Sequence, residues 1–137
     1  LFRSISKWKY RYTTTSTVRS MNVRPLAVQD IDLKGCGMTL TQPAGGTFFV
    51  ADAQGAARIR LGDERVKLSR QQASGASLPG GQQEVQLFAD PTGQVQVKVQ
   101  LSVAGAAHAG RQSVLAQLEV DTPSGFNLLS MAGETGC

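Results

Sequence analysis

The segment "QVQVKVQLSV", residues 94–103, constrains the fold of this chain more than any other part of it. Apolar residues alternate with polar ones without a break, so Val95, Val97, Val99, Leu101 and Val103 fall on one face. A period of two over a whole segment is typical of a strand with one face buried and the other in water. Strands of this kind form antiparallel sheets, and the segment therefore predicts an all-β protein.

Other segments repeat this alternation between short turn sequences. In "AARIRLGDERVKLSR", residues 56–70, apolar and basic residues alternate on both sides of Gly62-Asp63, a dipeptide suited to a two-residue hairpin turn. Further strands are expected in "MTLTQ", "TFFVADAQGAARI", "EVQLFADPTGQVQV", "SVLAQLEVD" and "FNLLSMAGE", where "DAQG" and "DPTG" supply turns. These segments together predict an antiparallel barrel or barrel-like sandwich of about eight short strands, because closure of the sheet removes the open edges that invite aggregation.

The chain of 137 residues is long enough for one domain with a substantial core. We expect a single β domain over residues 33–137, starting near Leu33, with residues 21–32 as a lead-in segment. No stretch approaches the roughly 18 uninterrupted apolar residues of a transmembrane helix.

The two cysteines, Cys36 and Cys137, lie at the two ends of the patterned region. One disulfide between them would tie the start of the domain to its end, and closing a loop of ~100 residues is worth about 4.7 kcal/mol on the chain-entropy model. A disulfide favours an oxidising compartment and thus a periplasmic or secreted location. The alternative is two free thiols in a cytosolic protein. "LKGC" is similar to a lipoprotein signal, but Lys34, Asp30 and Asp32 interrupt the apolar run that such a signal needs.

The basic character of the chain comes from its first twenty residues. These carry five Lys or Arg and no acid, whereas residues 21–137 carry nine Lys or Arg against ten Asp or Glu, a net charge of −1. Nucleic-acid-binding domains spread their charge over a folded face, so the charge distribution argues against a nucleic-acid partner. The arm, residues 1–20, is open to three interpretations: an expression-derived or disordered extension upstream of Met21, a transit-like segment, or a basic arm for acidic partners.

Catalytic and metal-binding motifs are not evident in the sequence. His108 is the only histidine and lies in "AGAAHAG", where nothing positions it as a base or a metal ligand. Asp52, Asp63, Asp90 and Asp121 all lie at expected turns, where Asp commonly accepts hydrogen bonds from the backbone. We therefore expect no catalytic residue, no metal and no cofactor. A hydrolase that uses His108 or a pair of turn acids is the least favoured interpretation.

Basic residues form a stripe in the hairpin at residues 56–70. Across a two-residue turn, Arg58, Arg60, Arg65 and Lys67 can share one sheet face. Such a stripe could receive an acidic partner or an anionic glycan. The favoured interpretation, however, is a solvated outer face whose charges guard against edge pairing.

The next segment, "RQQASGASLPGGQQ", residues 70–83, is too long for a tight turn and is expected to project as a loop of small polar residues. Around residues 56–76, "ARIRLGDERVKLSRQQASGA" resembles C-type lysozyme inhibitors of the membrane-bound and periplasmic kinds. Those proteins are small antiparallel β-barrels of bacterial envelopes. The resemblance implies that Ser74, Gly75 and Ala76 enter a lysozyme cleft, with Ser74 as the contact residue. Where that family continues with a basic residue and Tyr, this chain has Ser77 and Leu78.

Together these features predict a non-enzymatic binding protein of the bacterial envelope. Its partner would be a protein, such as a lysozyme or another muramidase, that the chain inhibits or confers immunity against through loop 70–80. In this hypothesis the basic stripe flanks the contact. The alternative is a structural or assembly component of an envelope complex.

Overall fold

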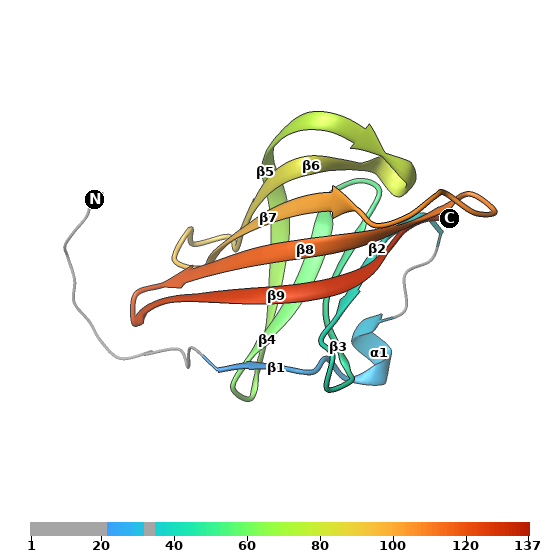
Figure 1. Ribbon diagram of the computed structural model, residues 1–137. Helices are drawn as coiled ribbons and strands as arrows, with labels where there is room; N and C mark the ends of the chain where they lie inside the picture. The colour runs from blue at the N-terminus through green and yellow to red at the C-terminus, as the bar shows by residue number, and fades with distance from the viewer. Residues whose placement is uncertain (1–21, 32–34) are drawn as a thin grey trace.

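The computed structural model of the chain describes residues 22–31 and 35–137 (Figure 1). The basic arm at residues 1–20, Met21 and the expected domain start at Leu33 lie outside the described residues. Strands account for most of the described chain, and neither helical element, α1 nor η2, has the length and apolar composition to cross a membrane.

The elements follow one another with short connections. They are β1 (Val23–Arg24), α1 (Val28–Ile31), β2 (Gly37–Thr41), β3 (Thr47–Asp52), β4 (Ala56–Leu61), β5 (Glu64–Leu78), the 3-10 turn η2 (Pro79–Gly81), β6 (Gln82–Ala89), β7 (Gln96–Val103), β8 (Arg111–Thr122) and β9 (Gly125–Gly136). Each of the strands β2 to β9 pairs antiparallel with the next one along the chain, and β9 returns to pair with β2. The predicted barrel is thus confirmed, as a closed eight-stranded meander with β1 added beside the end of β4.

The turn sequences form the hairpins expected of them. Gly62-Asp63 connects β4 to β5 as a two-residue turn, with Gly62 at a φ of +60° and Leu61 paired with Glu64. In "DPTG" the amide of Gly93 donates to the carbonyl of Asp90 over 3.0 Å. The carboxylates of Asp52 and Asp90 accept backbone amides in their turns, which explains why Asp occurs there.

The barrel interior is built by the alternation seen in the sequence. In β7 the residues Val97, Val99 and Leu101 are buried, and they meet the buried even-numbered residues of β8, such as Ala116 and Leu118. Aromatic rings fill the centre, where Phe49 and Phe88 pack edge to face with centroids 5.3 Å apart. Strand β6 departs from the expected pattern: Val85 and Leu87 are half-buried, and the fully buried positions are Gln82, Gln86 and Phe88.

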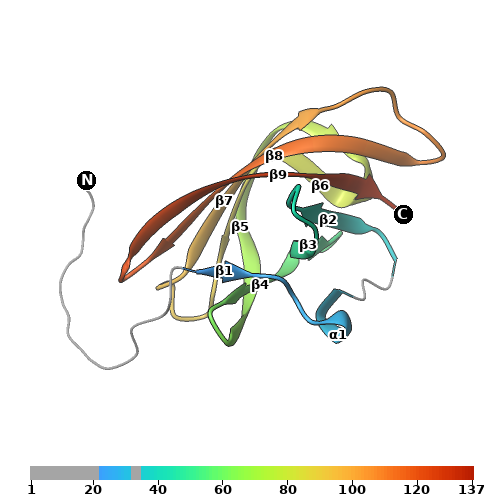
Figure 2. The ribbon, with the colours of Figure 1, turned by 60° about the horizontal axis from the view of Figure 1, so that its bottom comes forward.

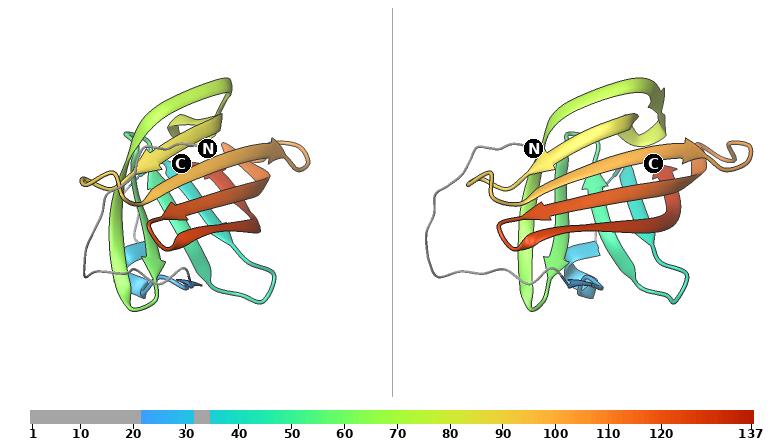
Figure 3. Two further views of the ribbon diagram at one scale, coloured as in Figure 1. Left: turned by 90° about the vertical axis from the view of Figure 1, so that its left-hand side faces the viewer. Right: turned by 60° about the vertical axis from the view of Figure 1, so that its left-hand side comes forward.

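The two ends of the barrel are covered by different segments. At one end the lead-in residues 22–31 pack against it, with the amide of Leu26 donating to the carbonyl of Thr47 over 2.8 Å and Leu26 buried (Figure 2). Asp30 of α1 contacts Arg65 on the outer side of β5, and residues on both faces of β3 are buried. At the other end β5 and β6 arch over the opening and carry η2 at their tip (Figure 3).

The disulfide between Cys36 and Cys137 is present, as predicted. Cys36 precedes β2 and Cys137 follows β9, and the adjacent Gly37 and Gly136 are directly paired. The bond therefore lies at the seam where the first and last barrel strands meet.

Candidate functional site

The segment expected to be a projecting loop is instead a strand, and this expectation was wrong. Residues 70–78 belong to β5, which continues past its last pair with β4, Ser69 with Ala56, and stays paired with β6 as far as Leu78. The reason is that residues 82–89 follow as a strand and satisfy the backbone groups of β5, which a loop would leave to water. Only Pro79, Gly80 and Gly81 form the turn.

Residues 71–77 nevertheless form a continuous exposed surface, which we name the β5 ridge. All seven residues in this run are exposed, and none of them is charged. The strand register shifts between Ser74 and Ser77, so the ridge contains a bulge. Ser74, Gly75 and Ala76, the residues expected to contact a partner, lie in this bulge.

The shape of the bulge is held by Glu84 on β6. Its carboxylate accepts the amide of Ala76 over 2.9 Å. Gly75 has a φ of +85°, and a Cβ atom there would lie 2.8 Å from the Cβ of Glu84. A residue other than glycine is therefore excluded both by backbone conformation and by space, so the ridge has a defined form.

Beneath the ridge lies a polar network that the sequence analysis did not identify. The guanidinium of Arg70 donates to the Gln86 side-chain carbonyl and to the backbone carbonyl of Gly81, both over 2.9 Å. The Gln86 amide donates in turn to Gln82 Oε1 over 3.1 Å, and the Gln82 amide donates to the carbonyls of Gly80 and Asp52. This network connects the arch to the barrel wall. Its signal in the sequence is faint: two glutamines four residues apart and one arginine in an otherwise uncharged run.

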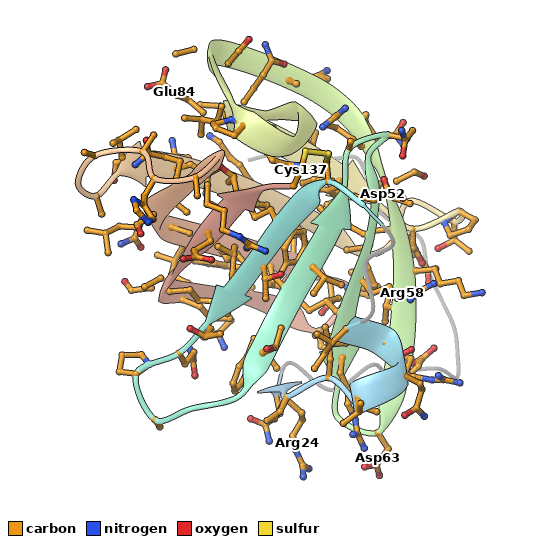
Figure 4. All side chains as sticks on the ribbon, turned by 90° about the vertical axis from the view of Figure 1, so that its right-hand side faces the viewer. Arg24, Asp52, Arg58, Asp63, Glu84 and Cys137 are labelled. Atoms are coloured by element: carbon orange, nitrogen blue, oxygen red, sulfur yellow. A yellow bond between two sulfur atoms is a disulfide. The ribbon has the colours of Figure 1, made fainter. Side chains whose placement is uncertain are left out.

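The tip of the arch rests on the opposite wall of the barrel. At Gly80 a Cβ atom would lie 2.6 Å from the carbonyl oxygen of Gly37 and 2.8 Å from the amide nitrogen of Gly136. Those two residues adjoin the disulfide, so the tip is seated beside Cys36 and Cys137. In Figure 4 the labelled Glu84 on the arch and Cys137 lie at the same end of the molecule.

The four residues of the basic stripe do share one face, as predicted. Arg58 is paired directly with Lys67, and Arg60 with Arg65, on the outer side of the β4–β5 ladder. Arg24 of β1 extends the row, because it is paired with Arg60. The stripe is partly neutralised: Arg65 contacts Asp30 over 3.0 Å and Arg60 contacts Asp63 over 3.6 Å.

The basic stripe, on β4 and β5, and the ridge, on β5 alone, lie at different heights of the barrel. Seven residues separate Lys67 from Ser74, which corresponds to at most about 23 Å along a strand. Figure 4 shows the same separation, with Arg24 and Asp63 at one end, Glu84 at the other and Arg58 between them. One compact contact therefore does not include both, and only a large partner would cover them together.

A shallow open pocket of about 460 Å³ adjoins the disulfide on the outside of the barrel. Arg111 and Glu134 line it and form an ion pair with each other over 3.1 Å. Their charges are thereby satisfied within the protein, so the pocket offers little to an ionic ligand.

The single histidine takes no part in these surfaces. His108 is exposed in the β7–β8 connection, where its backbone exchanges hydrogen bonds with Arg111 around a tight turn. Within residues 22–31 and 35–137, no group of three or more His, Cys, Asp or Glu side chains is placed to hold a metal ion. The chain matches no protein-family model, no curated protein and no solved structure.

Proposed function

We propose that this protein is a non-enzymatic binding protein of the bacterial envelope that holds a protein partner through the β5 ridge. One observation carries the proposal: seven consecutive exposed, uncharged residues form a paired strand, and Glu84 holds the bulge in their middle. A surface that is already ordered loses little conformational entropy when it binds, and affinity benefits from that preorganisation.

The chemistry of the ridge fits a narrow polar cleft. Its residues are Gln, Ala, Ser and Gly, whose side chains are small or carry amide and hydroxyl groups. Small side chains let a strand backbone enter a cleft, and Gln and Ser can donate hydrogen bonds to carboxylates. Enzymes that cleave glycosidic bonds carry such a pair of carboxylates in their clefts. Together with the resemblance to lysozyme inhibitors, this favours a muramidase as the partner.

The disulfide supports an envelope location, and the charge of the domain bears on how a partner is recognised. The Cys36–Cys137 disulfide is of the kind that persists in oxidising compartments such as the periplasm. The barrel residues are close to neutral in charge, which leaves recognition to the shape of the ridge and to the local stripe of Arg58 and Lys67.

The proposal predicts that the protein slows lysis of bacterial cell walls by at least one muramidase. Ser74→Trp places a large ring on the bulge, so it should weaken inhibition at least tenfold, or about 1.4 kcal/mol. The measurement is the fall in turbidity of a cell-wall suspension over a range of inhibitor concentrations.

The matched control is Ser113→Trp, which places the same ring on an exposed position of β8, three strands across the sheet from β5. This variant should inhibit as well as the original protein, and both variants should unfold at unchanged temperatures. If the original protein inhibits no enzyme in a panel of muramidases, the proposed partner is wrong. If Ser113→Trp weakens inhibition as much as Ser74→Trp, the ridge is not the contact surface.

A further inference from the structure

The last strand, β9, has an unpaired edge over half of its length. It pairs with β8 along all of Gly125–Gly136, but β2 covers its other side only at residues 132–136. Along residues 125–131, no other strand of the described chain forms a ladder with that side. Figure 1 shows the β8–β9 hairpin extending well past the end of β2.

This edge lacks the features with which proteins protect open strands. Native edges are usually blunted by charged residues, by proline or by a bulge. The sequence of residues 125–131, "GFNLLSM", has no charge and no proline, and the β8–β9 ladder has no register shift. Phe126 and Leu128 add exposed apolar surface, with 64% and 60% of each residue in solvent. An exposed, apolar and regular edge is typical of a strand that pairs with another chain.

We propose that residues 125–131 form a homodimer interface, in which β9 pairs antiparallel with β9 of a second copy. A two-fold axis normal to the sheet makes such a contact self-complementary, since each copy presents the same surface. Residues directly opposite each other in an antiparallel pair point to the same face. The two-fold axis must therefore lie midway between two copies of the same residue. Only an axis at Leu128, the central residue of the segment, pairs all seven positions.

The geometry of this pairing explains the exposed side chains. Leu128 lies opposite Leu128 of the second copy, and the two Phe126 rings flank them on the same outer face. The closest acids, Glu119 and Asp121, are paired with Leu128 and Phe126 from the β8 side and thus lie away from the edge. The pairing adds about six to eight backbone hydrogen bonds. A second copy is favoured over a different protein as the partner, because the segment has no charged residue that would select another protein.

The inference does not rest on the proposed function. In the strand order around the barrel, β9 and β5 lie on opposite sides, so a dimer through β9 leaves the β5 ridge free. Loss of the dimer and loss of muramidase inhibition are separate results.

The test is the mass of the full chain in solution by sedimentation velocity at high micromolar concentration. The original protein should sediment as a dimer, and Leu128→Lys should be a monomer because it places two like charges on the axis. Leu115→Lys is the matched control: it changes an exposed leucine, 54% in solvent, on the outer face of β8 and should leave the dimer intact. A monomeric original protein, or a dimer that survives Leu128→Lys, would overturn the proposal.

Crosslinking tests the register directly. Opposite Cβ atoms in an antiparallel pair lie about 4.5–5.5 Å apart, close to the distance that a disulfide spans. Leu128→Cys should therefore form a covalent dimer in air, seen as a doubled mass on a non-reducing gel. Leu115→Cys should remain a monomer under the same conditions. Equal crosslinking of both variants would contradict pairing through β9.

Discussion

At the scale of single residues, the most informative side chains are the polar ones inside the barrel. Gln86 has no exposed surface and Gln82 has 1%, although both occupy inward positions that an apolar residue would fill in most strands. Burial of an amide costs free energy unless its hydrogen bonds are made. Both amides are satisfied: they bond to each other, Gln86 accepts from Arg70, and both donate to backbone carbonyls of the arch or of β3. The network therefore determines where the arch sits rather than adding greatly to stability.

Gln86→Ala tests this network. The change removes one acceptor from Arg70 and leaves Gln82 Oε1 without its donor, so we expect a loss of about 1–3 kcal/mol in the free energy of unfolding. Urea denaturation monitored by circular dichroism measures it. Gln83→Ala is the control, because the side chain of Gln83 makes no hydrogen bond within the described part of the chain, and its effect should stay within about 0.5 kcal/mol. Equal effects of the two changes would contradict the role of the network.

At the scale of elements, the β5–η2–β6 arch depends on close contact between its tip and the opposite wall. Gly80→Ala should destabilise the protein for two reasons: a positive φ and a Cβ that collides with the backbone of Gly37 and Gly136. Gly93→Ala separates these causes, since Gly93 has the same φ of +76° but nothing within 4 Å of its added Cβ. We expect Gly80→Ala to lose about 1–3 kcal/mol more than Gly93→Ala, as overpacking usually costs.

Thermal unfolding of both variants in one buffer gives the comparison. Gly80→Ala should also raise the accessibility of the ridge to a protease, because a displaced tip frees both strands of the arch. If the two variants lose the same stability, the tip is not tightly seated.

The elements also show which parts of the fold the sequence could predict. Strands β7 and β8 followed from alternation because one face of each is apolar, and the Gly62-Asp63 turn followed from the dipeptide itself. From the same turn followed the correct prediction that Arg58, Arg60, Arg65 and Lys67 can share one sheet face.

The arch could not be predicted in this way. Residues 71–77 are exposed on both faces and have no period, and they are a strand only because β6 pairs with them. The buried glutamines of β6 were hidden for a related reason: their partners, Arg70 and the turn carbonyls, are brought close only by the folded arch.

At the scale of the whole molecule, barrel closure relies on the short ladder between β2 and β9. These strands share five paired positions, Gly37 to Thr41 with residues 132–136, and they come from opposite ends of the domain. Pairing strands so far apart in sequence costs loop-closure entropy. The Cys36–Cys137 bond, with a separation of 101 residues, removes much of that cost from the unfolded chain.

Replacement of both cysteines by serine should therefore lower the free energy of unfolding by about 2–5 kcal/mol without changing the native barrel. Reducing agent should lower the stability of the original protein similarly and leave the double variant unaffected. Hydrogen exchange then identifies the mechanism. If the disulfide stabilises the protein by constraining the unfolded chain, its removal should speed exchange even at the most protected amides of β7 and β8. The increase should correspond to the whole loss in the free energy of unfolding. If the bond instead holds the seam closed, only β2, residues 132–136 and the tip at Gly80 lose protection, because those are the parts that meet beside it.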